Sequence, residues 1–257
     1  MRTTYYQRGL IFLLLPCSMA FAEDSGWWVS VEGGYGFAIE ESHTNTVPMP
    51  NDPLPPLYDD YQTNDREGGF IVGATGGYQF ALNEEDDEDE SSWFPTARLG
   101  IGYEYVGSTD VNGQVIKYQE KPYYDYQYDV SAQVIWLDGQ IDLFDWCNFS
   151  PFIDAGIGIA FNRMSDYEEN RINTEVPVRE SADFSDETNT EFAWRAGVGV
   201  NYTIPEQDDA WTISVLTRYS DLGDAQTGSS QTYPTVGSIS SELVNIELLL
   251  ALRYNFD

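Results

Sequence analysis

The chain has 257 residues, a length that suits one domain of ordinary or large size. Acidic residues outnumber basic ones 43 to 12, which gives a formal net charge of −31. This balance excludes nucleic acid as a partner, because binding to phosphates requires positive charge. The acidic excess fits a solvated, self-repelling surface or an adaptation to salt, and divalent-cation binding stays open as a sharper alternative.

The N-terminus has the pattern of an export signal. A basic segment precedes the apolar run Leu10 to Leu15, and Ala20-Phe21-Ala22 has the small residues of a cleavage site. We therefore expect residues 1–22 to form a cleaved secretory signal peptide and residues 23–257 to form the mature domain. Cleavage would leave Cys147 as the lone cysteine, which excludes an intramolecular disulfide.

Eight later segments alternate apolar residues with polar or small ones. A period of two is the pattern of a β-strand with one apolar face, and inward glycines suit the narrow interior of a small barrel. The segments are Trp27 to Ile39, Gly68 to Leu82, Phe94 to Val106, Tyr126 to Phe144, Pro151 to Asn162, Glu191 to Ile204, Trp211 to Leu222 and Leu243 to Phe256.

The fourth segment changes its parity along its length. Tyr128 to Trp136 has apolar residues at even positions, whereas Gly139, Ile141 and Leu143 occupy odd positions. An extra residue near Leu137 would keep both sets on one face, and a β-bulge supplies such a residue. We therefore predict a bulge at this point.

The segment Leu243 to Phe256 has the clearest alternation. Its even-numbered positions are all apolar and end in Tyr254 and Phe256, whereas its odd-numbered positions include Glu247 and Arg253. A strand with lipid on one side and a polar lumen on the other has this pattern.

This last segment, with Phe192 to Tyr202 and Ser150 to Ala160, resembles small outer-membrane β-barrels of the OmpA transmembrane and opacity-protein types. The resemblance implies an all-β fold, an eight-stranded antiparallel up-and-down transmembrane β-barrel in the bacterial outer membrane. It also implies a monomer that is surrounded by outer-membrane lipid and lipopolysaccharide and inserted by the barrel-assembly machinery. Such barrels usually end on the aromatic residue itself, whereas Asp257 follows Phe256 here.

The connections between the segments alternate in length. Outer-membrane barrels have short periplasmic turns and long external loops, so both termini are expected in the periplasm. We expect the long loops to be mobile, because they are polar and offer little apolar surface to bury, and the first also contains Pro48, Pro50, Pro53, Pro55 and Pro56. The long connections are Glu40 to Glu67, Gly107 to Asp125, Arg163 to Thr190 and Gly223 to Ser241, and the short ones are Asp145 to Ser150 and Pro205 to Ala210.

The first turn, Asn83 to Trp93, is longer than a periplasmic turn needs to be. It contains seven consecutive acids, Glu84 to Glu90. Like charges repel, so we expect this run to stay solvated, and weak calcium binding is the alternative.

Strand alternation directs nine charged side chains into the predicted barrel. An eight-stranded barrel is just wide enough to be filled by side chains, so these ions are expected to pair and form a plug. We predict the pairs Arg253 with Glu32 and Arg218 with Glu247. The nine residues are Glu32, Arg98, Glu104, Asp129, Asp154, Arg195, Arg218, Glu247 and Arg253.

The residue types for catalysis are scarce. Hydrolytic and acyl-transfer barrels use histidine as a base or relay, and this chain has only His43, in the first long connection. We predict no enzymatic activity, cofactor or metal site. Function is therefore interpreted as a structural, adhesive or surface-binding role through the acidic external loops, with an external ligand or host surface as partner. A narrow pore is the first alternative, and a loop-based lipid-modifying enzyme that uses His43 is the second.

Overall fold

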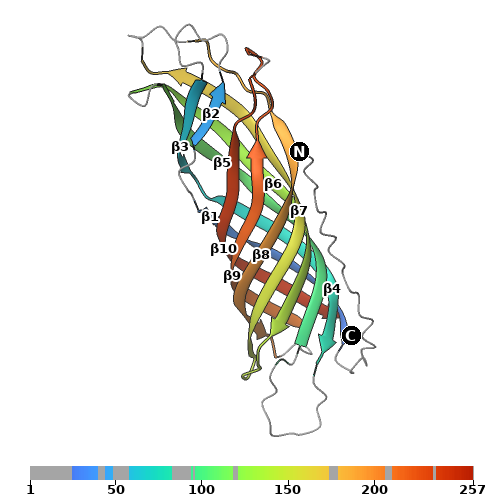
Figure 1. Cartoon of the computed structure of the whole chain (residues 1–257). Helices are drawn as coiled ribbons and strands as arrows, with labels where there is room; N and C mark the ends of the chain where they lie inside the picture. The colour runs from blue at the N-terminus through green and yellow to red at the C-terminus, as the bar shows by residue number, and fades with distance from the viewer. Residues whose placement is uncertain are drawn as a thin grey trace, which may run out of the picture.

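The computed structural model describes residues 25–39, 44–48, 58–82, 94, 96–117, 121–173, 179–205, 210–233 and 236–256. The predicted signal peptide, His43 and the acidic run at 84–90 lie outside these ranges. Within them, the structure contains no helix that is long and apolar enough to span a membrane. Its ten strands (Figure 1) are β1 (Gly26–Ala38), β2 (Thr44–Pro48), β3 (Tyr58–Arg66), β4 (Gly69–Ala81), β5 (Thr96–Lys117), β6 (Lys121–Asp142), β7 (Phe149–Arg171), β8 (Glu187–Thr203), β9 (Trp211–Gln226) and β10 (Ser240–Phe256).

Eight of these ten described strands close a ring (Figure 1). Neighbours pair in the order β1, β4, β5, β6, β7, β8, β9 and β10, and β10 returns to β1. Every pairing is antiparallel, and the closing seam sets Trp27 opposite Phe256 and Ala38 opposite Asn245. The predicted all-β antiparallel barrel is therefore confirmed.

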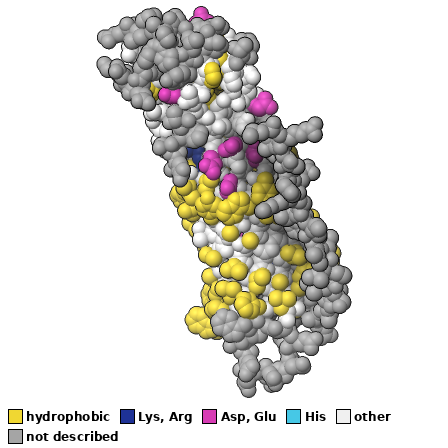
Figure 2. Space-filling model, viewed as in Figure 1, with side chains coloured by type: hydrophobic (Ala, Val, Ile, Leu, Met, Phe, Trp, Pro, Cys, Tyr) yellow, Lys and Arg dark blue, Asp and Glu magenta, His cyan; other side chains and the backbone are white. Residues whose placement is uncertain are grey.

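Side chains on the ring strands alternate between the outside and the lumen. On β10, Leu248 and Leu250 are 55% and 58% exposed, whereas Glu247 and Leu249 are 0% and 2% exposed. The same alternation on the other strands produces an apolar band around the lower part of the barrel, part of which is visible in Figure 2. Exposed apolar surface of this extent suits lipid, so the band marks the membrane-spanning part of the barrel.

Several strands continue far beyond this band, where they form a second structure that we call the head. The head comprises the described residues within 44–67, 108–131, 163–190 and 223–243. In it, β5 pairs with β6 up to Lys117 and Lys121, at the end of the hairpin. Strand β4 pairs with β5 only as far as Ile71 and Val106. Beyond that point β3 pairs with β5, and β2 pairs with β3. Much of the sequence that we predicted to be loop is therefore β-sheet.

The head also has a buried core, which the sequence interpretation missed. The prediction that the long connections bury too little apolar surface to become ordered is wrong for the described residues. Aromatic side chains from distant segments meet inside the head: the rings of Tyr167 and Phe184 lie 5.0 Å apart, and those of Tyr61 and Tyr126 lie 5.6 Å apart. The buried set includes Val47, Tyr61, Val111, Val115, Tyr126, Tyr128, Tyr167, Phe184 and Ile239.

The predicted bulge near Leu137 is also wrong. Strand β6 keeps one register with β5 from Ala132 to Ile141 and with β7 from Asp129 to Asp142. Its even-numbered residues face inward throughout, and Trp136 is 1% exposed while Leu137 is 53% exposed. Consecutive apolar residues occupy both faces of the strand here, so the sequence pattern does not indicate which face points into the lumen. The register shifts lie higher, in the head, where β6 meets β7 between Gln127 and Asp129.

Candidate functional site

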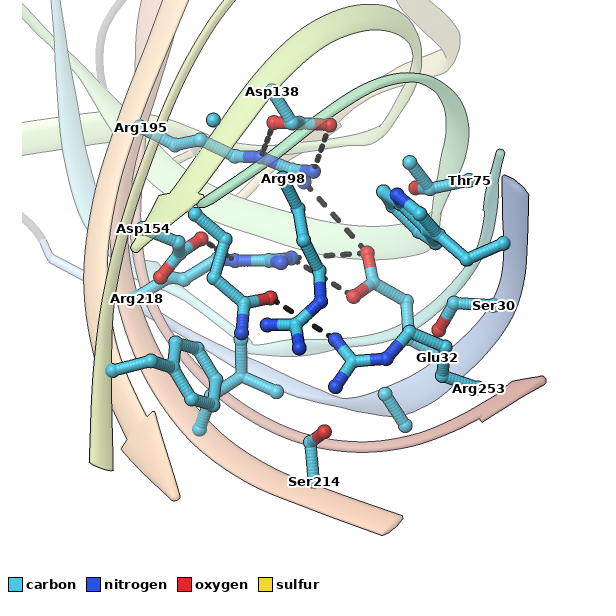
Figure 3. Close-up of a pocket in the computed structure, with 16 residues that line it drawn as sticks. Ser30, Glu32, Thr75, Arg98, Asp138, Asp154, Arg195, Ser214, Arg218 and Arg253 are labelled. Carbon is cyan, nitrogen blue, oxygen red and sulfur yellow. Dashed lines mark hydrogen bonds and ion pairs between the residues drawn. The ribbon is translucent and has the colours of Figure 1, made fainter. Parts of the chain in front are cut away.

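The lumen of the spanning region contains a network of buried ions (Figure 3). Four arginines enter it from β5, β8, β9 and β10, and each is less than 10% exposed. Charged groups buried from water require partners, because the cost of removing an ion from water is several kcal/mol. The geometry of each arginine therefore determines what the lumen can do.

Arg195 lies at the centre of the upper part of this network. Its guanidinium donates to Glu104 at 2.7 Å and to Asp138 at 2.8 Å. It also stacks over the ring of Trp136, with its central carbon 4.4 Å from the ring centroid. Space for Arg195 depends on Gly156, because a Cβ atom there would lie 2.3 Å from an oxygen of Asp138 and 3.2 Å from the Arg195 side chain.

Arg218 crosses the lumen to bind two carboxylates from other strands. Its Nη1 donates to Glu32 on β1 at 2.9 Å, and its Nε donates to Asp154 on β7 at 2.7 Å. Glu247 is the direct cross-strand partner of Arg218 in the β9–β10 ladder. Nevertheless, the predicted Arg218–Glu247 pair is wrong, because the long arginine side chain reaches past its neighbour to the two other acids.

Glu247 instead accepts a hydrogen bond from the Ser220 hydroxyl. Its second carboxylate oxygen is buried and has no hydrogen-bond partner among the described residues. Glu247 is 0% exposed, so this carboxyl group is enclosed by the barrel with no arginine within ion-pair distance among the described residues.

Arg98 closes the end of the network that lies away from the head. Its Nη1 lies 2.8 Å from both carboxylate oxygens of Asp142, and its Nε donates to Gln79 at 2.8 Å. Asn201 also donates to Asp142, at 3.0 Å. This end of the lumen is therefore built from one ion pair and the amides around it.

Arg253 differs from the other three arginines. The predicted pair with Glu32 is wrong, because Glu32 turns toward Arg218 and lies 3.8 Å from Arg195. The Arg253 guanidinium donates to the amide oxygen of Gln140 at 3.4 Å, and its Nε has no acceptor among the described residues. No described carboxylate lies within ion-pair distance of it.

Eight of the nine predicted lumen residues do face inward, and Asp129 does not. Asp129 lies on the outer face of the head, where it accepts a hydrogen bond from Ser108 at 3.2 Å. Its neighbours Tyr128 and Val130 are the inward residues of this stretch. Two inward acids, Asp138 and Asp142, were missed. The sequence pattern could have identified them, because a strand that directs Gly139 and Ile141 outward must direct Asp138 and Asp142 inward.

These side chains surround a small cavity near the centre of the network (Figure 3), which we call the lumen cavity. Its volume is about 50 Å³, room for about three to five water-sized spheres. Its polar lining includes Ser30, Thr75 and Ser214 beside the ions. A cavity of this size is far too small to be an open channel.

A second cluster of buried ions holds the head together. Arg179 donates from Nε to Asp59 on β3 at 2.6 Å and from Nη1 to Glu169 on β7 at 2.8 Å, and all three side chains are 0% exposed. It also donates to the Tyr61 oxygen at 2.7 Å and lies over the Tyr124 ring, 5.3 Å from the centroid. Arg179 thereby ties the segment before β8 to the sheet.

Tyrosines complete this cluster around Glu169. The hydroxyl groups of Tyr61 and Tyr167 donate to the same carboxylate oxygen, at 3.0 Å and 2.7 Å, and the Ala182 amide donates to the other at 2.9 Å. Burial, the largest single influence, would raise the pKa of Glu169, but the interactions with Arg179, together with the hydrogen bonds from Tyr167 and the Ala182 amide, outweigh it and lower the pKa. Burial, reinforced by the nearby negative charge, raises the pKa values of Tyr61 and Tyr167 well above the ordinary value.

The closed antiparallel ring, the lipid-facing apolar band and the ion-filled lumen together define a membrane β-barrel. Residues 9–243 match the family described as "Outer membrane protein beta-barrel domain". The chain belongs to this family, and it is a bacterial outer-membrane protein.

Individual relatives are distant. The chain is 26% identical to outer membrane protein PagN of Salmonella typhimurium (strain LT2) over 111 residues, which are 42% of this chain and 44% of PagN. The match therefore spans less than half of PagN. Among solved structures, OprG from Pseudomonas aeruginosa is 9% identical, with a TM-score of 0.45 over 90% of this chain and 96% of OprG. Neisserial surface protein A is 14% identical, with a TM-score of 0.38 over 91% of this chain and all of that one.

Proposed function

We propose that this protein is a surface-binding barrel whose acidic head recognises a cationic partner outside the cell. The observation that carries the proposal is the charge of the head surface. Among the head residues whose side chains the structure describes, eleven acidic side chains are exposed and two basic ones are, Arg163 and Arg171. The acids are Glu67, Asp110, Asp125, Asp166, Glu168, Glu180, Asp183, Asp186, Glu187, Asp224 and Glu242. Figure 2 shows acidic side chains above the apolar band.

The order of the head supports this role. A binding surface that is already rigid loses less conformational entropy when a partner binds. The exposed acids Asp125 and Glu168 lie on strands β6 and β7, and the cluster around Arg179 holds the core beneath them. A basic protein segment or another polycation would therefore meet charges at fixed positions, and opposite charge would speed its association.

The packing of the lumen supports a binding role over the alternative of a narrow pore. Three of the four lumen arginines are bound to carboxylates at 2.7 to 2.9 Å. The Arg98 pair joins the neighbouring strands β5 and β6, and the Arg195 and Arg218 pairs cross the lumen between strands that are not neighbours. Conduction would require these bonds to break, which is costly for buried pairs. In this proposal the spanning barrel is the support for the head, and the protein has no catalytic role.

The test measures binding of a fluorescent polylysine probe to intact cells that carry the protein. We expect binding that weakens with added salt, because contacts between exposed charges are screened. The triple variant Asp110→Asn, Asp125→Asn, Glu168→Gln should lose most of this binding. The matched control is Asp145→Asn, an exposed acid in the short connection between β6 and β7 at the opposite end of the barrel.

Three results would overturn the proposal. One is probe binding by the triple variant equal to that of the parent, and another is binding that salt does not change. The third is equal loss of binding in the Asp145→Asn control, since that residue lies away from the head. Membrane extraction and heat-dependent gel mobility should confirm first that each variant assembles.

A further inference from the structure

We propose that the lumen cavity is a binding site for a small monovalent anion, with Arg253 as its principal ligand. This proposal is independent of the role of the head. Its starting observation is the exceptional position of Arg253, the one lumen arginine with no carboxylate within ion-pair distance in the described ranges.

Arg253 is buried with most of its hydrogen-bonding capacity unused. A guanidinium group has five N–H donors. The side chain is 4% exposed, its single acceptor among the described residues is the neutral amide of Gln140 at 3.4 Å, and its Nε donor is buried without one. A buried cation in this state is costly, and a mobile anion can supply both the charge and the acceptor that it lacks.

The cavity presents further donors to such an ion. Trp28 lines the same cavity, is 7% exposed, and has an indole N–H without an acceptor in the described part of the chain. Ser30 and Thr75, whose hydroxyl groups can donate, also line the cavity, whereas the Ser214 hydroxyl donates to Asn201 at 2.6 Å. Figure 3 shows the guanidinium groups of Arg98 and Arg253 both directed into this space.

Charge along the lining favours an anion near Arg253 over a cation. The charged residues that line the cavity are four arginines, Arg98, Arg195, Arg218 and Arg253, and three acids, Glu32, Asp138 and Asp154. Those acids are bound to Arg195 and Arg218 at 2.7 to 2.9 Å, and the Arg98 charge is met by Asp142 behind the lining. Of the arginines that line the cavity, Arg253 alone has no described carboxylate within ion-pair distance, so its charge is the least compensated at short range, where Coulomb interactions are strongest.

Size selects the class of anion. A volume of about 50 Å³ admits a halide with one or two waters, but not a sugar acid or a nucleotide. The site therefore fits chloride, and bromide is a heavier probe of the same charge and similar size. Gln140 would stay in place as a second contact to Arg253, since its amide nitrogen donates to Asp142 at 3.0 Å.

The experiment locates bromide directly. Crystals of the purified wild-type barrel soaked in sodium bromide should show an anomalous difference peak beside the Arg253 guanidinium, and crystals of Arg253→Gln should lose it. Glutamine keeps a polar side chain and removes the charge. A wild-type cavity that holds water alone, or a bromide peak that persists in Arg253→Gln, would overturn the proposal.

A second measurement needs no crystals and separates a bound ion from general salt effects. Heating unfolds the barrel and changes its migration on a gel. For the wild type, the temperature at which this change occurs should be higher in sodium bromide than in sodium gluconate of equal ionic strength. The shift should saturate with bromide concentration, as expected for one site. The difference should persist in the exposed-arginine control Arg163→Gln and disappear in Arg253→Gln. Should Arg253→Gln not assemble, the wild-type comparison decides, and equal temperatures in the two salts would refute the site.

Discussion

Replacing Arg179 with alanine should open the head while leaving the membrane barrel intact. The change removes the cation between Asp59 and Glu169, whose side chains are 0% exposed and lie 2.6 and 2.8 Å from Arg179. Breaking a buried ion pair from one side costs about 3–5 kcal/mol, because the remaining charge is left without compensation. That loss should raise the population of the open head by roughly a hundred-fold to a few thousand-fold.

Protease added to intact cells measures this population. Cleavage of a transiently opened segment follows the equilibrium fraction that is open when opening and closing are fast. The parent head should resist a broad-specificity protease, and the Arg179→Ala head should be cut near residues 179–186, which Arg179 anchors. Heat-dependent mobility of the barrel should be unchanged, since the cluster lies in the head, beyond the spanning part of the strands.

The matched control is Arg163→Ala. Arg163 forms an ion pair with Asp186 at 3.0 Å, but these side chains are 57% and 52% exposed. Exposed pairs contribute about 0–1 kcal/mol, so this variant should remain nearly as resistant as the parent. If Arg179→Ala is as resistant as Arg163→Ala, the buried cluster does not hold the head and the reasoning fails.

Three further predictions concern the lumen and the response of the head to pH. Arg195→Ala should destabilise the barrel by about 3–5 kcal/mol, because it leaves Glu104 and Asp138 buried without their cation, and should therefore strongly lower the temperature at which its gel mobility changes. An unchanged temperature would contradict the idea that these ion pairs hold the lumen closed. Recordings in planar bilayers should show no large steady conductance in the wild type, and a wide, stable open state would favour the pore alternative. The raised pKa values of Tyr61 and Tyr167 contribute stability that is complete below the ordinary tyrosine pKa of about 10 and is lost as pH rises through their higher folded values. The head should therefore become protease-sensitive above about pH 10, less so in Tyr167→Phe, and equal alkaline sensitivity in the two proteins would contradict this cause.

The spanning barrel could be predicted from sequence because its physics is simple. Lipid on one side and a narrow lumen on the other favour alternation, and the segment Leu243 to Phe256 has an apolar residue at every even-numbered position. Alternation also predicted which way Arg195, Arg218 and Arg253 point. It failed in β6, where apolar residues on both faces erased the contrast.

The head could not be predicted in the same way. A membrane-spanning strand needs only about 9–11 residues, so strand signals beyond that length were assigned to loops. The run Tyr123 to Tyr128 does carry aromatic residues at alternate positions, but its inward face packs against Tyr167, which in turn contacts Phe184, and both come from distant segments. Contacts of this kind depend on the closed fold, and a local pattern does not contain them.

Strand alternation could not predict which charged residues pair inside the lumen, for a different reason. An arginine side chain is long enough to reach several strands, so its direction does not identify its partner. Arg218 sits opposite Glu247 in the ladder yet binds Glu32 and Asp154. The choice depends on where small residues leave room, as Gly197 does beside Arg218 and Asp154.

Amide hydrogen exchange in lipid nanodiscs measures whether the strands continue outside the membrane as one ordered head. Segment 111–116 of β5 is hydrogen-bonded on both sides, to β3 and to β6. We predict that its amides exchange nearly as slowly as those of residues 97–106 in the spanning part of the same strand. If the amides of 111–116 exchange at the rate of an unstructured chain while those of 97–106 stay protected, the head is a set of mobile loops and not an ordered sheet.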